Sequence, residues 1–163
     1  NSDTTYRVFD WNRKGADGKP RELHIEKALD VIDFEEKHLR GKVKGLTLYE
    51  QGGTRTFYVA CKHFAMEKLE IYGEMNEHTN GDKFFTLTVV EGTGEIRYGG
   101  ESQFFSAGDS LLIPAALGPY SIVGNCTVLK AYVADRQRDI INYLEARGFN
   151  REQMSAIAGL FDE

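Results

Sequence analysis

The sequence of 163 residues contains little proline and no long apolar run. Three prolines against 17 glycines leave few rigid linkers and favour many tight turns. No apolar run approaches the roughly 20 residues of a membrane-spanning helix, so no membrane partner is expected. The 20 basic and 25 acidic residues give a net charge of −5. Because binding to a nucleic-acid backbone needs a basic face, no nucleic-acid partner is expected either.

Cysteine and histidine are also scarce, and neither is spaced for metal binding. The two cysteines, Cys61 and Cys126, lie far apart in the sequence, and we expect them to be small buried side chains. A disulfide or a reactive thiol is the alternative. No Cys-x-x-Cys or Cys/His spacing typical of zinc occurs. The four histidines are isolated from one another: His24, His38, His63 and His78.

The length and composition, with 41% hydrophobic and 28% charged residues, are typical of one globular domain with a core. Residues 4–9 are rich in Thr, Tyr, Val and Phe, which predicts a strand. Residues 12–20 are a turn-rich loop. Residues 21–33 place apolar side chains near i, i+3 and i+4 spacing, which predicts an amphipathic helix. Residues 34–55 are polar and irregular.

The pattern changes in residues 56–133 to short aromatic and β-branched runs, most of them separated by glycine-containing turns. Many short strands at spacings of about 8–12 residues are typical of an antiparallel sandwich or barrel. The predicted strands cover residues 56–60, 64–71, 83–91, 94–98, 102–105, 110–113, 120–123 and 128–133.

One of these predicted strands changes phase. Phe64 and Met66 point to one side of the strand, whereas Leu69 and Ile71 point to the other. A bulge near Glu67-Lys68 would account for the change.

Residues 134–163 predict a helical hairpin. Residues 135–147 form a helix closed by Gly148, and Asn150 begins a second helix with Gln153 as its capping-box partner. The apolar face of the hairpin contains no paired ionisable groups, so we expect it to stabilise the domain and to carry no chemistry. The alternative is an oligomer contact or a contact with a missing part of the protein.

Two segments resemble cupin motifs. The sequence Gly-Thr-Gly-Glu-Ile at residues 92–96 resembles the turn before a barrel strand, and residues 106–115 resemble the Gly-Asp-x-x-x-x-Pro strand at the barrel mouth. The resemblance implies an all-β fold, a jelly-roll-like antiparallel cupin barrel with the N-terminal helix and the C-terminal hairpin added. A functional cupin metal site needs His-x-His, a later Glu and one more His. Tyr120 stands near the place of that last His, so we expect no metal site in this chain.

Arg7 is the most informative charged residue, because it lies mid-strand between Tyr6 and Val8. Guanidinium groups bind phosphate oxygens in two-point fashion, which suits a phosphate group. A structural ion pair with a nearby acid is the alternative for Arg7. Four further bases cluster near it in an otherwise acidic chain: Arg13, Lys14, Lys19 and Arg21.

Carboxylates are plentiful, but nothing in their spacing sets two of them against one another. We expect them to be solvated surface charges. The acid/base candidates in this group are Glu35, Glu36, Glu67, Glu70, Glu74 and Glu77.

Two long segments resemble the type I mannose-6-phosphate isomerases of bacteria, in the order that this family has them. They are Asn-Ser-Asp-Thr-Thr-Tyr-Arg-Val-Phe-Asp at residues 1–10 and Gly-Lys-Pro-Arg-Glu-Leu-His-Ile-Glu-Lys-Ala-Leu-Asp-Val-Ile at residues 18–32. The resemblance covers residues 1–133 and does not explain the hairpin. It implies a cytoplasmic enzyme of carbohydrate metabolism that interconverts mannose 6-phosphate and fructose 6-phosphate.

The resemblance also implies roles for particular residues. Arg7 would be catalytic and Arg21 would bind the substrate. The zinc cofactor of the parent enzyme would be bound by residues upstream of Asn1, so this chain would lack its zinc half as a partner and would be inactive alone. The implied domains are a junction strand, basic loop and helix, a cupin barrel, and the hairpin, at residues 1–55, 56–133 and 134–163.

Two other functions stay open. One is a non-catalytic, metal-free cupin module that binds a sugar or supports another domain. The other is a stand-alone cupin oxidoreductase or dioxygenase, against which the missing His-x-His argues.

Overall fold

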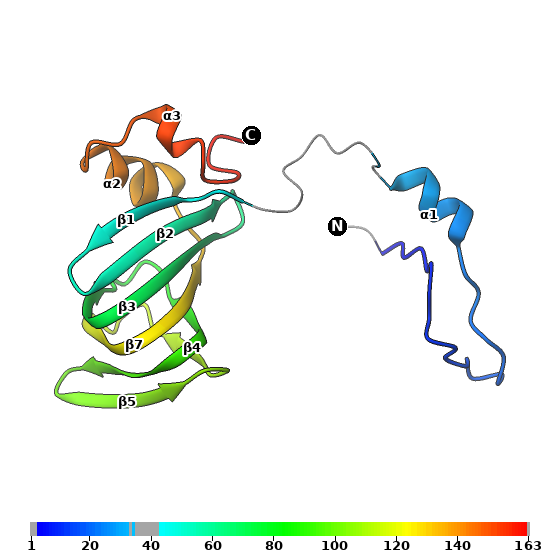
Figure 1. Cartoon of the computed structure of the whole chain (residues 1–163), viewed down its shortest axis with the longest axis horizontal. Coiled ribbons are helices and arrows are strands. Elements are labelled where there is room, and N and C mark those ends of the chain that lie inside the picture. The colour runs from blue at the N-terminus through cyan, green and yellow to red at the C-terminus, as the bar shows by residue number, and fades with distance from the viewer. Residues whose placement is uncertain (1–2, 33, 35–42, 163) are drawn as a thin grey trace. The chain divides into compact units, whose positions relative to one another are not determined.

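The computed structural model describes residues 3–32, 34 and 43–162. The chain forms two compact units, Asn1–Gly41 and Lys42–Glu163, and each is described by itself. Figure 1 shows a short helix and extended chain in the first unit, and a sheet with small helices in the second. The domain boundaries expected after residues 55 and 133 stay predictions.

The first unit contains one helix, α1 (Ile25–Val31), among its described residues. The helix predicted at 21–33 is therefore right in kind but shorter than expected. The strand predicted at 4–9 is wrong: this segment is extended chain without a strand partner. It is held instead by His24, whose backbone N–H donates to the Arg7 carbonyl at 2.7 Å and whose Nδ1 accepts from the Arg7 N–H at 3.2 Å. Apolar composition favours a strand, but a ladder also needs a neighbour.

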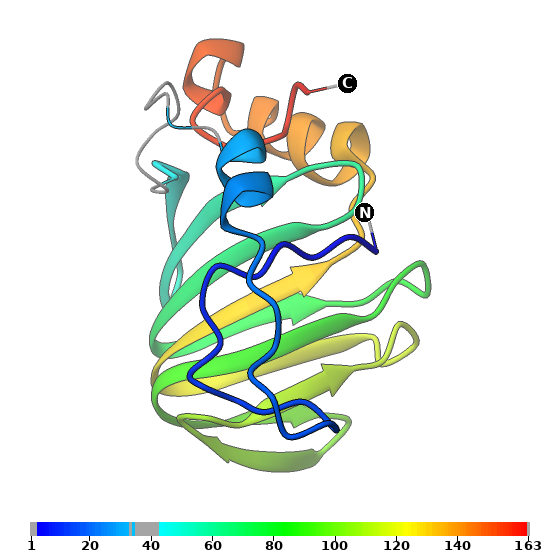
Figure 2. The ribbon, with the colours of Figure 1, turned by 90° about the vertical axis from the view of Figure 1, so that its right-hand side faces the viewer.

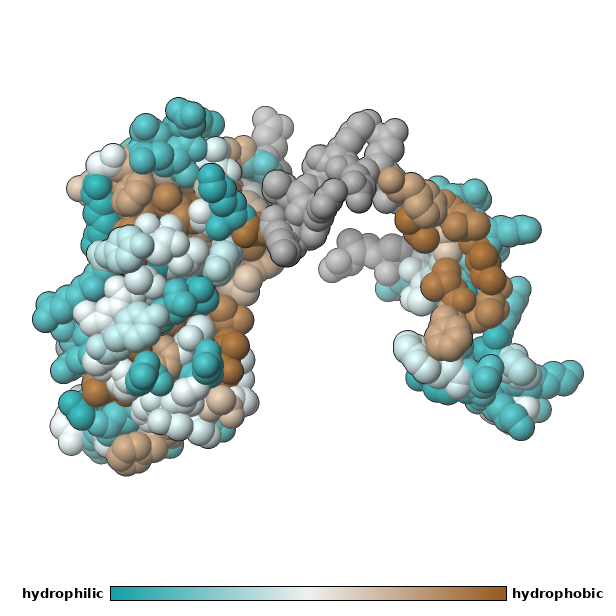
Figure 3. All heavy atoms as spheres, viewed as in Figure 1, coloured by the Kyte–Doolittle hydropathy of each residue, from teal (hydrophilic) through white to brown (hydrophobic). Residues whose placement is uncertain are grey.

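Many apolar side chains of the first unit are exposed. Figure 3 shows them gathered along α1 and the chain beside it. The most exposed of them, each more than half accessible, are Val8, Phe9, Trp11, Leu29, Val31 and Phe34.

The second unit contains a seven-stranded antiparallel sheet in the order β1-β2-β3-β7-β4-β5, with β6 paired to β4. The sheet is strongly curved (Figure 2), with β1 and β5 at its edges, so no ladder closes it into a barrel. The all-β, antiparallel, cupin-like prediction is confirmed. The strands are β1 (Leu46–Glu50), β2 (Gly53–Ala60), β3 (Ala65–His78), β4 (Phe85–Tyr98), β5 (Glu101–Ser106), β6 (Ser110–Ile113) and β7 (Pro119–Tyr132).

Three strands are longer than the sequence indicated. The runs predicted at 83–91 and 94–98 are one strand, β4, and those at 120–123 and 128–133 join in β7. β3 continues to His78 and pairs with β7 along its whole length. β1 lies in a segment that was expected to be irregular.

Glycines explain why these long strands looked broken. Gly73 of β3, Gly124 of β7 and Gly94 of β4 are paired in register, so they form a row across three neighbouring strands. A Cβ on Gly94 would lie 2.4 Å from the Val123 carbonyl oxygen, and one on Gly124 would lie 2.5 Å from the Thr93 oxygen. Glycine within a strand marks a sharp bend or a close approach of backbones, and here it marks both rather than a turn.

The bulge predicted near Glu67-Lys68 is wrong, because β3 pairs with β7 there without a shift in register. The shift lies on the other neighbour, in β2, between Phe57 and Val59. Glu67 occupies an inward position of regular alternation, with Leu69 and Ile71. The apparent change of phase was a buried carboxylate in a place where an apolar residue is usual.

The C-terminal segment forms a helical hairpin at one end of the sheet, as predicted (Figure 1). Its elements are η2 (Arg136–Ile141), a single π-helical stretch, followed by α2 (Asn142–Glu145) and α3 (Arg151–Met154). The capping box of Asn150 and Gln153 is present. The backbone of Ala158 bonds to Tyr58 and Ala60 of β2, which docks the segment on the sheet.

One apolar core joins the sheet to the hairpin. Cys126 is part of it, whereas Cys61 is only half-buried, and both are free thiols. No helix within the described ranges is long and apolar enough to cross a membrane. Core residues that are essentially inaccessible include Phe57, Leu69, Ile71, Leu87, Val89, Ile122, Ile140, Leu144 and Met154.

Candidate functional site

Two groups of polar residues qualify as sites, one in each unit. In the first unit, three arginines converge on the carboxylate of Asp10. Arg21 forms a two-point contact, with Nε 2.7 Å from Oδ2 and NH2 2.5 Å from Oδ1. Arg13 NH2 lies 3.0 Å from Oδ1, and Arg7 Nε lies 3.7 Å from the same oxygen. Arg7 also donates from NH1 to the Glu22 carbonyl at 3.2 Å.

The electrostatics of this arginine cluster favour an anion. The hydrogen bonds from Arg21 are the largest cause that lowers the pKa of Asp10 to about 2, and the charges of Arg21, Arg13 and Arg7 act in the same direction against the effect of burial. Asp10 is therefore ionised near neutral pH, and one negative charge faces three positive ones.

The structure thus brings together the two residues that the sequence singled out, Arg7 and Arg21. It also adds Asp10, which sequence reasoning missed. The sequence could have indicated Asp10, because an acid three residues after Arg7 is close enough to form an ion pair with it. The roles of Arg7 and Arg21 in catalysis and substrate binding stay predictions.

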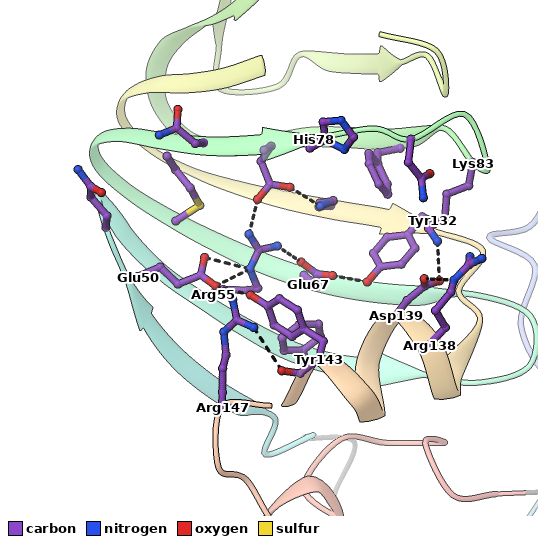
Figure 4. Close-up of a pocket in the computed structure, with 18 of the residues that line it drawn as sticks. Glu50, Arg55, Glu67, His78, Lys83, Tyr132, Arg138, Asp139, Tyr143 and Arg147 are labelled. Carbon is purple, nitrogen blue, oxygen red and sulfur yellow. Dashed lines mark hydrogen bonds and ion pairs between the residues drawn. The ribbon is translucent and has the colours of Figure 1, made fainter. Parts of the chain in front are cut away.

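In the second unit, a cavity of about 840 Å³ opens between the sheet and the hairpin (Figure 4). Its walls come from β1, β2, β3, β4, β7, η2 and α2 and from short connecting segments. The lining residues that form charged or hydrogen-bonded contacts include Glu50, Arg55, Glu67, Glu77, Lys83, Lys130, Tyr132, Arg138, Asp139, Tyr143 and Arg147.

Arg55 is the centre of the cavity floor. It is 7% exposed, and its guanidinium contacts three carboxylates. Nε lies 3.1 Å from Glu50, NH1 donates to Glu67, and NH2 donates to Glu77. Burial would lower the pKa of Arg55, but the three carboxylates outweigh it and raise that pKa.

Three further donors complete this network. Lys130 Nζ lies 2.5 Å from Glu77, and the Tyr143 hydroxyl lies 2.7 Å from Glu50. The Tyr132 hydroxyl donates to Glu67. Burial would raise the pKa of Glu77, but Lys130 and Arg55 lower it. The floor is therefore a rigid set of paired charges in which every carboxylate has a partner.

The expectation that the carboxylates are solvated is wrong for Glu67 and Glu77. The side chain of Glu67 is 2% exposed and that of Glu77 is 5% exposed, and both contact one guanidinium. Glu74 is exposed, as expected, while Glu35, Glu36 and His38 lie outside the described residues. The inward position of Glu67 in an alternating strand was the signal that could have identified it.

The hairpin forms the opposite wall of the cavity. Lys83 Nζ lies 2.5 Å from Asp139, and Arg138 NH1 lies 3.0 Å from Asp82. The Arg147 guanidinium stacks 3.6 Å from the centre of the Tyr143 ring. These pairs lie on the polar side of the hairpin, so the expectation about its apolar face stays a prediction.

Zinc has no matching site in the part of the chain that the structure describes. No group of three or more His, Cys, Asp or Glu side chains there is arranged to hold a metal ion. His78 is exposed at the cavity, and Tyr120 is 3% exposed on β7 opposite Glu77. The Tyr120 hydroxyl has no hydrogen-bond partner among the described residues, and burial raises its pKa.

Comparison with known proteins gives one family. The sequence model of the family described as mannose-6-phosphate isomerase, cupin domain, matches residues 54–133. Mannose-6-phosphate isomerase ManA of Bacillus subtilis is 33% identical over 124 residues, which are 76% of this chain and 38% of ManA. The mannose-6-phosphate isomerase of Streptococcus mutans is 31% identical over 134 residues, 80% of this chain and 40% of its own length.

Solved structures agree with these matches. The crystal structure of mannose 6-phosphate isomerase from Bacillus subtilis has a TM-score of 0.62 and 32% identity, covering 80% of this chain and 41% of that one. The nucleoside dehydratase Pac13, with a TM-score of 0.52 and 16% identity over 60% of this chain and 82% of that one, shares the fold alone. The chain spans less than half the length of the curated relatives that it matches.

Proposed function

This chain belongs to the mannose-6-phosphate isomerase family as its cupin part, and we propose that it serves an enzyme that interconverts mannose 6-phosphate and fructose 6-phosphate. The observation that supports this most is the arginine cluster on Asp10. It lies in residues 1–32, whose sequence resembles the family, and its three guanidinium groups suit a phosphorylated, negatively charged substrate.

The contacts suggest different roles for Arg7 and Arg21. Arg21 is bound at two points to Asp10, so its guanidinium plane is fixed and suits the phosphate side of the substrate. Arg7 has no two-point contact: its Nε lies 3.7 Å from Asp10 and its guanidinium donates one hydrogen bond to the Glu22 carbonyl, which leaves other N–H groups for a bound sugar. Isomerisation moves a proton between C1 and C2, and Arg7 would stabilise negative charge that develops on the sugar oxygens.

We further propose that the rest of the enzyme comes from another segment, which the resemblance places upstream. Zinc bound there would polarise the sugar oxygens, and the described residues of this chain do not form a site for it. The exposed apolar side chains of the first unit, such as Phe9, Trp11 and Val31, support a contact with that segment.

Replacing Arg7 in the full-length enzyme tests this proposal. Arg7→Ala is expected to lower kcat/KM about 10²–10³-fold, because a positioned charge at a developing oxyanion contributes on that scale. The melting temperature is expected to stay within a few degrees. Arg97→Ala is the control, since Arg97 on β4 has an exposed side chain that pairs with Glu95. A loss mainly in stability would make Arg7 a structural ion-pair partner and would overturn its catalytic role.

A further inference from the structure

The cavity in the second unit uses none of the residues proposed for the isomerase reaction. We propose that it is a binding site for a small polyhydroxylated anion, a sugar phosphate or a sugar acid, completed by the C-terminal hairpin. The inference does not depend on the isomerase proposal, because it rests on the shape, lining and charge of this cavity alone.

The size and depth of the cavity fit such a ligand. Small-molecule sites typically enclose about 300–1,000 Å³, and this one encloses about 840 Å³. Its floor is largely shielded from solvent, because Arg55, Glu67 and Lys130 are each at most 7% exposed. The desolvation of these charges is already compensated by their mutual contacts, so a ligand meets a preformed polar surface.

The polar lining fits hydroxyl groups. Carboxylate oxygens of Glu50 and Glu77 face the cavity as acceptors, and Arg55 and Lys130 supply donors beside them. A sugar hydroxyl is both donor and acceptor, so it can bond to either member of such a pair.

Aromatic side chains also line the cavity. Phe85 and Tyr132 pack edge to face at 5.2 Å on the sheet side, and Tyr143 stands on the hairpin side. Lys130 lies over the Phe85 ring and Arg147 over the Tyr143 ring, so the exposed ring available to a ligand is that of Tyr49, which is 89% exposed.

One base of the lining is free to bind an anion. Four carboxylates, Glu50, Glu67, Glu77 and Asp139, line the cavity with five bases, Arg55, Lys83, Lys130, Arg138 and Arg147, and Asp82 beside it pairs with Arg138. The base left over is Arg147, because no carboxylate among the described residues lies within ion-pair distance of it. Its stacking on Tyr143 holds it at the cavity, where it can bind a phosphate or carboxylate.

The hairpin is what completes this site. Arg138, Asp139, Tyr143 and Arg147 all follow residue 133, where the match to the family's cupin domain ends. The matched cupin contributes the floor, and the added segment contributes the anion-binding wall.

Calorimetric titration of the 163-residue chain tests the inference with four probes: mannose 6-phosphate, gluconate, mannose and inorganic phosphate. We expect mannose 6-phosphate or gluconate to bind more tightly than mannose and than phosphate. If mannose binds as tightly, the site does not recognise the anionic group, and if phosphate binds as tightly, it does not recognise the hydroxyl groups. Either result, or no binding of any probe, would overturn the proposal.

Two arginine variants locate the ligand. Arg147→Ala is expected to weaken binding about tenfold, as loss of a charged hydrogen bond implies. Arg151→Ala is the matched control, because Arg151 stacks on Phe161 at 4.0 Å in the same hairpin but does not line the cavity. An equal effect of both variants would overturn the assignment to the cavity.

Arg7→Ala separates this proposal from the previous one. We expect it to leave binding at the cavity unchanged while it impairs turnover of the full-length enzyme. If Arg7→Ala abolishes binding of mannose 6-phosphate to the chain and Arg147→Ala does not, the ligand lies at the arginine cluster. That result would overturn the cavity site and support the isomerase proposal.

Discussion

Two buried tyrosines of β7 differ in whether their hydroxyl group has a hydrogen-bond partner. The Tyr132 hydroxyl donates to Glu67, whereas the Tyr120 hydroxyl has no partner among the described residues. An unsatisfied buried polar group carries a desolvation cost, and a satisfied one offsets it. The two hydroxyl groups are therefore expected to have opposite effects on the free energy of unfolding, although the two side chains are similarly buried.

Substituting each tyrosine by phenylalanine is expected to change stability in opposite directions. Tyr120→Phe removes an unpaired hydroxyl and should raise the free energy of unfolding by up to about 1 kcal/mol. Tyr132→Phe leaves an oxygen of buried Glu67 without its donor and should lower it by about 1–3 kcal/mol. Urea denaturation measures both. A clear destabilisation by Tyr120→Phe would mean that its hydroxyl has a partner, such as a bound water.

The pH dependence of the arginine cluster follows from Asp10. Its pKa in the folded chain is about 2, below the ordinary value of 3.8, so ionised Asp10 stabilises the folded state. That contribution is fully present above pH 3.8 and is lost as the pH falls from there through about 2. An NMR titration of the Asp10 carboxyl should show this low pKa, and Arg21→Ala should raise it. An unchanged pKa in Arg21→Ala would contradict the assigned cause.

At the scale of single residues, the alternation along β3 indicated that Glu67 is buried, but the sequence did not indicate its partners. Arg55 of β2 and Tyr132 of β7 reach Glu67 from strands on either side. Tyr132 is 65 residues away in the sequence, so local spacing could not reveal that contact. Arg7 and Arg21 could be singled out because basic residues cluster there in an otherwise acidic chain.

At the scale of elements, the hairpin contributes to the core as well as to the cavity. Leu144 of α2 is completely buried in the cluster that joins the hairpin to the sheet. Its neighbours in that cluster include Ile140, Ile157 and Leu160. The hairpin is therefore held by apolar burial as well as by its backbone bonds to β2.

Truncating Leu144 measures this docking. Leu144→Ala is expected to lower the free energy of unfolding by about 2–5 kcal/mol, through lost transfer energy and the cavity left behind. Leu112→Ala on β6 is the control, because Leu112 is 63% exposed and should change stability by less than about 0.5 kcal/mol. Thermal or chemical denaturation gives both values. Equal effects would mean that the hairpin is not docked as described.

The elements themselves were predictable where a local rule decides them. The capping box at Asn150 and the positive φ of Gly148 after the preceding helix could be predicted, because the residue types at these positions favour them. The ends of the strands could not be predicted. Gly92 and Gly94 look like a turn in the sequence, and only their pairing with β7 shows that the strand continues. The π-helical turn of η2 has no comparable local signal.

At the scale of the whole molecule, the fold class and the family could both be inferred from sequence, and the two units could not. The first unit is short and keeps many apolar side chains exposed, whereas the second holds the core. The residues proposed for the isomerase reaction lie in the first unit. In this proposal the second unit supplies most of the stability and the first unit supplies the residues for the reaction.

We expect the 163-residue chain to be folded but to lack isomerase turnover on its own. The second unit has a complete apolar core, while the proposed zinc site belongs to another segment. Circular dichroism and a coupled isomerase assay on the same sample measure the two properties. The full-length enzyme is the positive control, and clear turnover by the chain alone would refute the proposed division.

The glycine row has a geometrical consequence for the charges of the cavity. Glu67 and Glu77 are ten positions apart on β3, which in a straight strand would separate them by about 33 Å. Yet both carboxylates contact the guanidinium of Arg55, so β3 must turn back on itself between them, and Gly73 lies in that interval. A Cβ added at Gly94 or Gly124 would lie within 2.5 Å of a backbone oxygen of the neighbouring strand, so we expect it to disturb the bend and the contacts of both carboxylates with Arg55, without altering any charged residue.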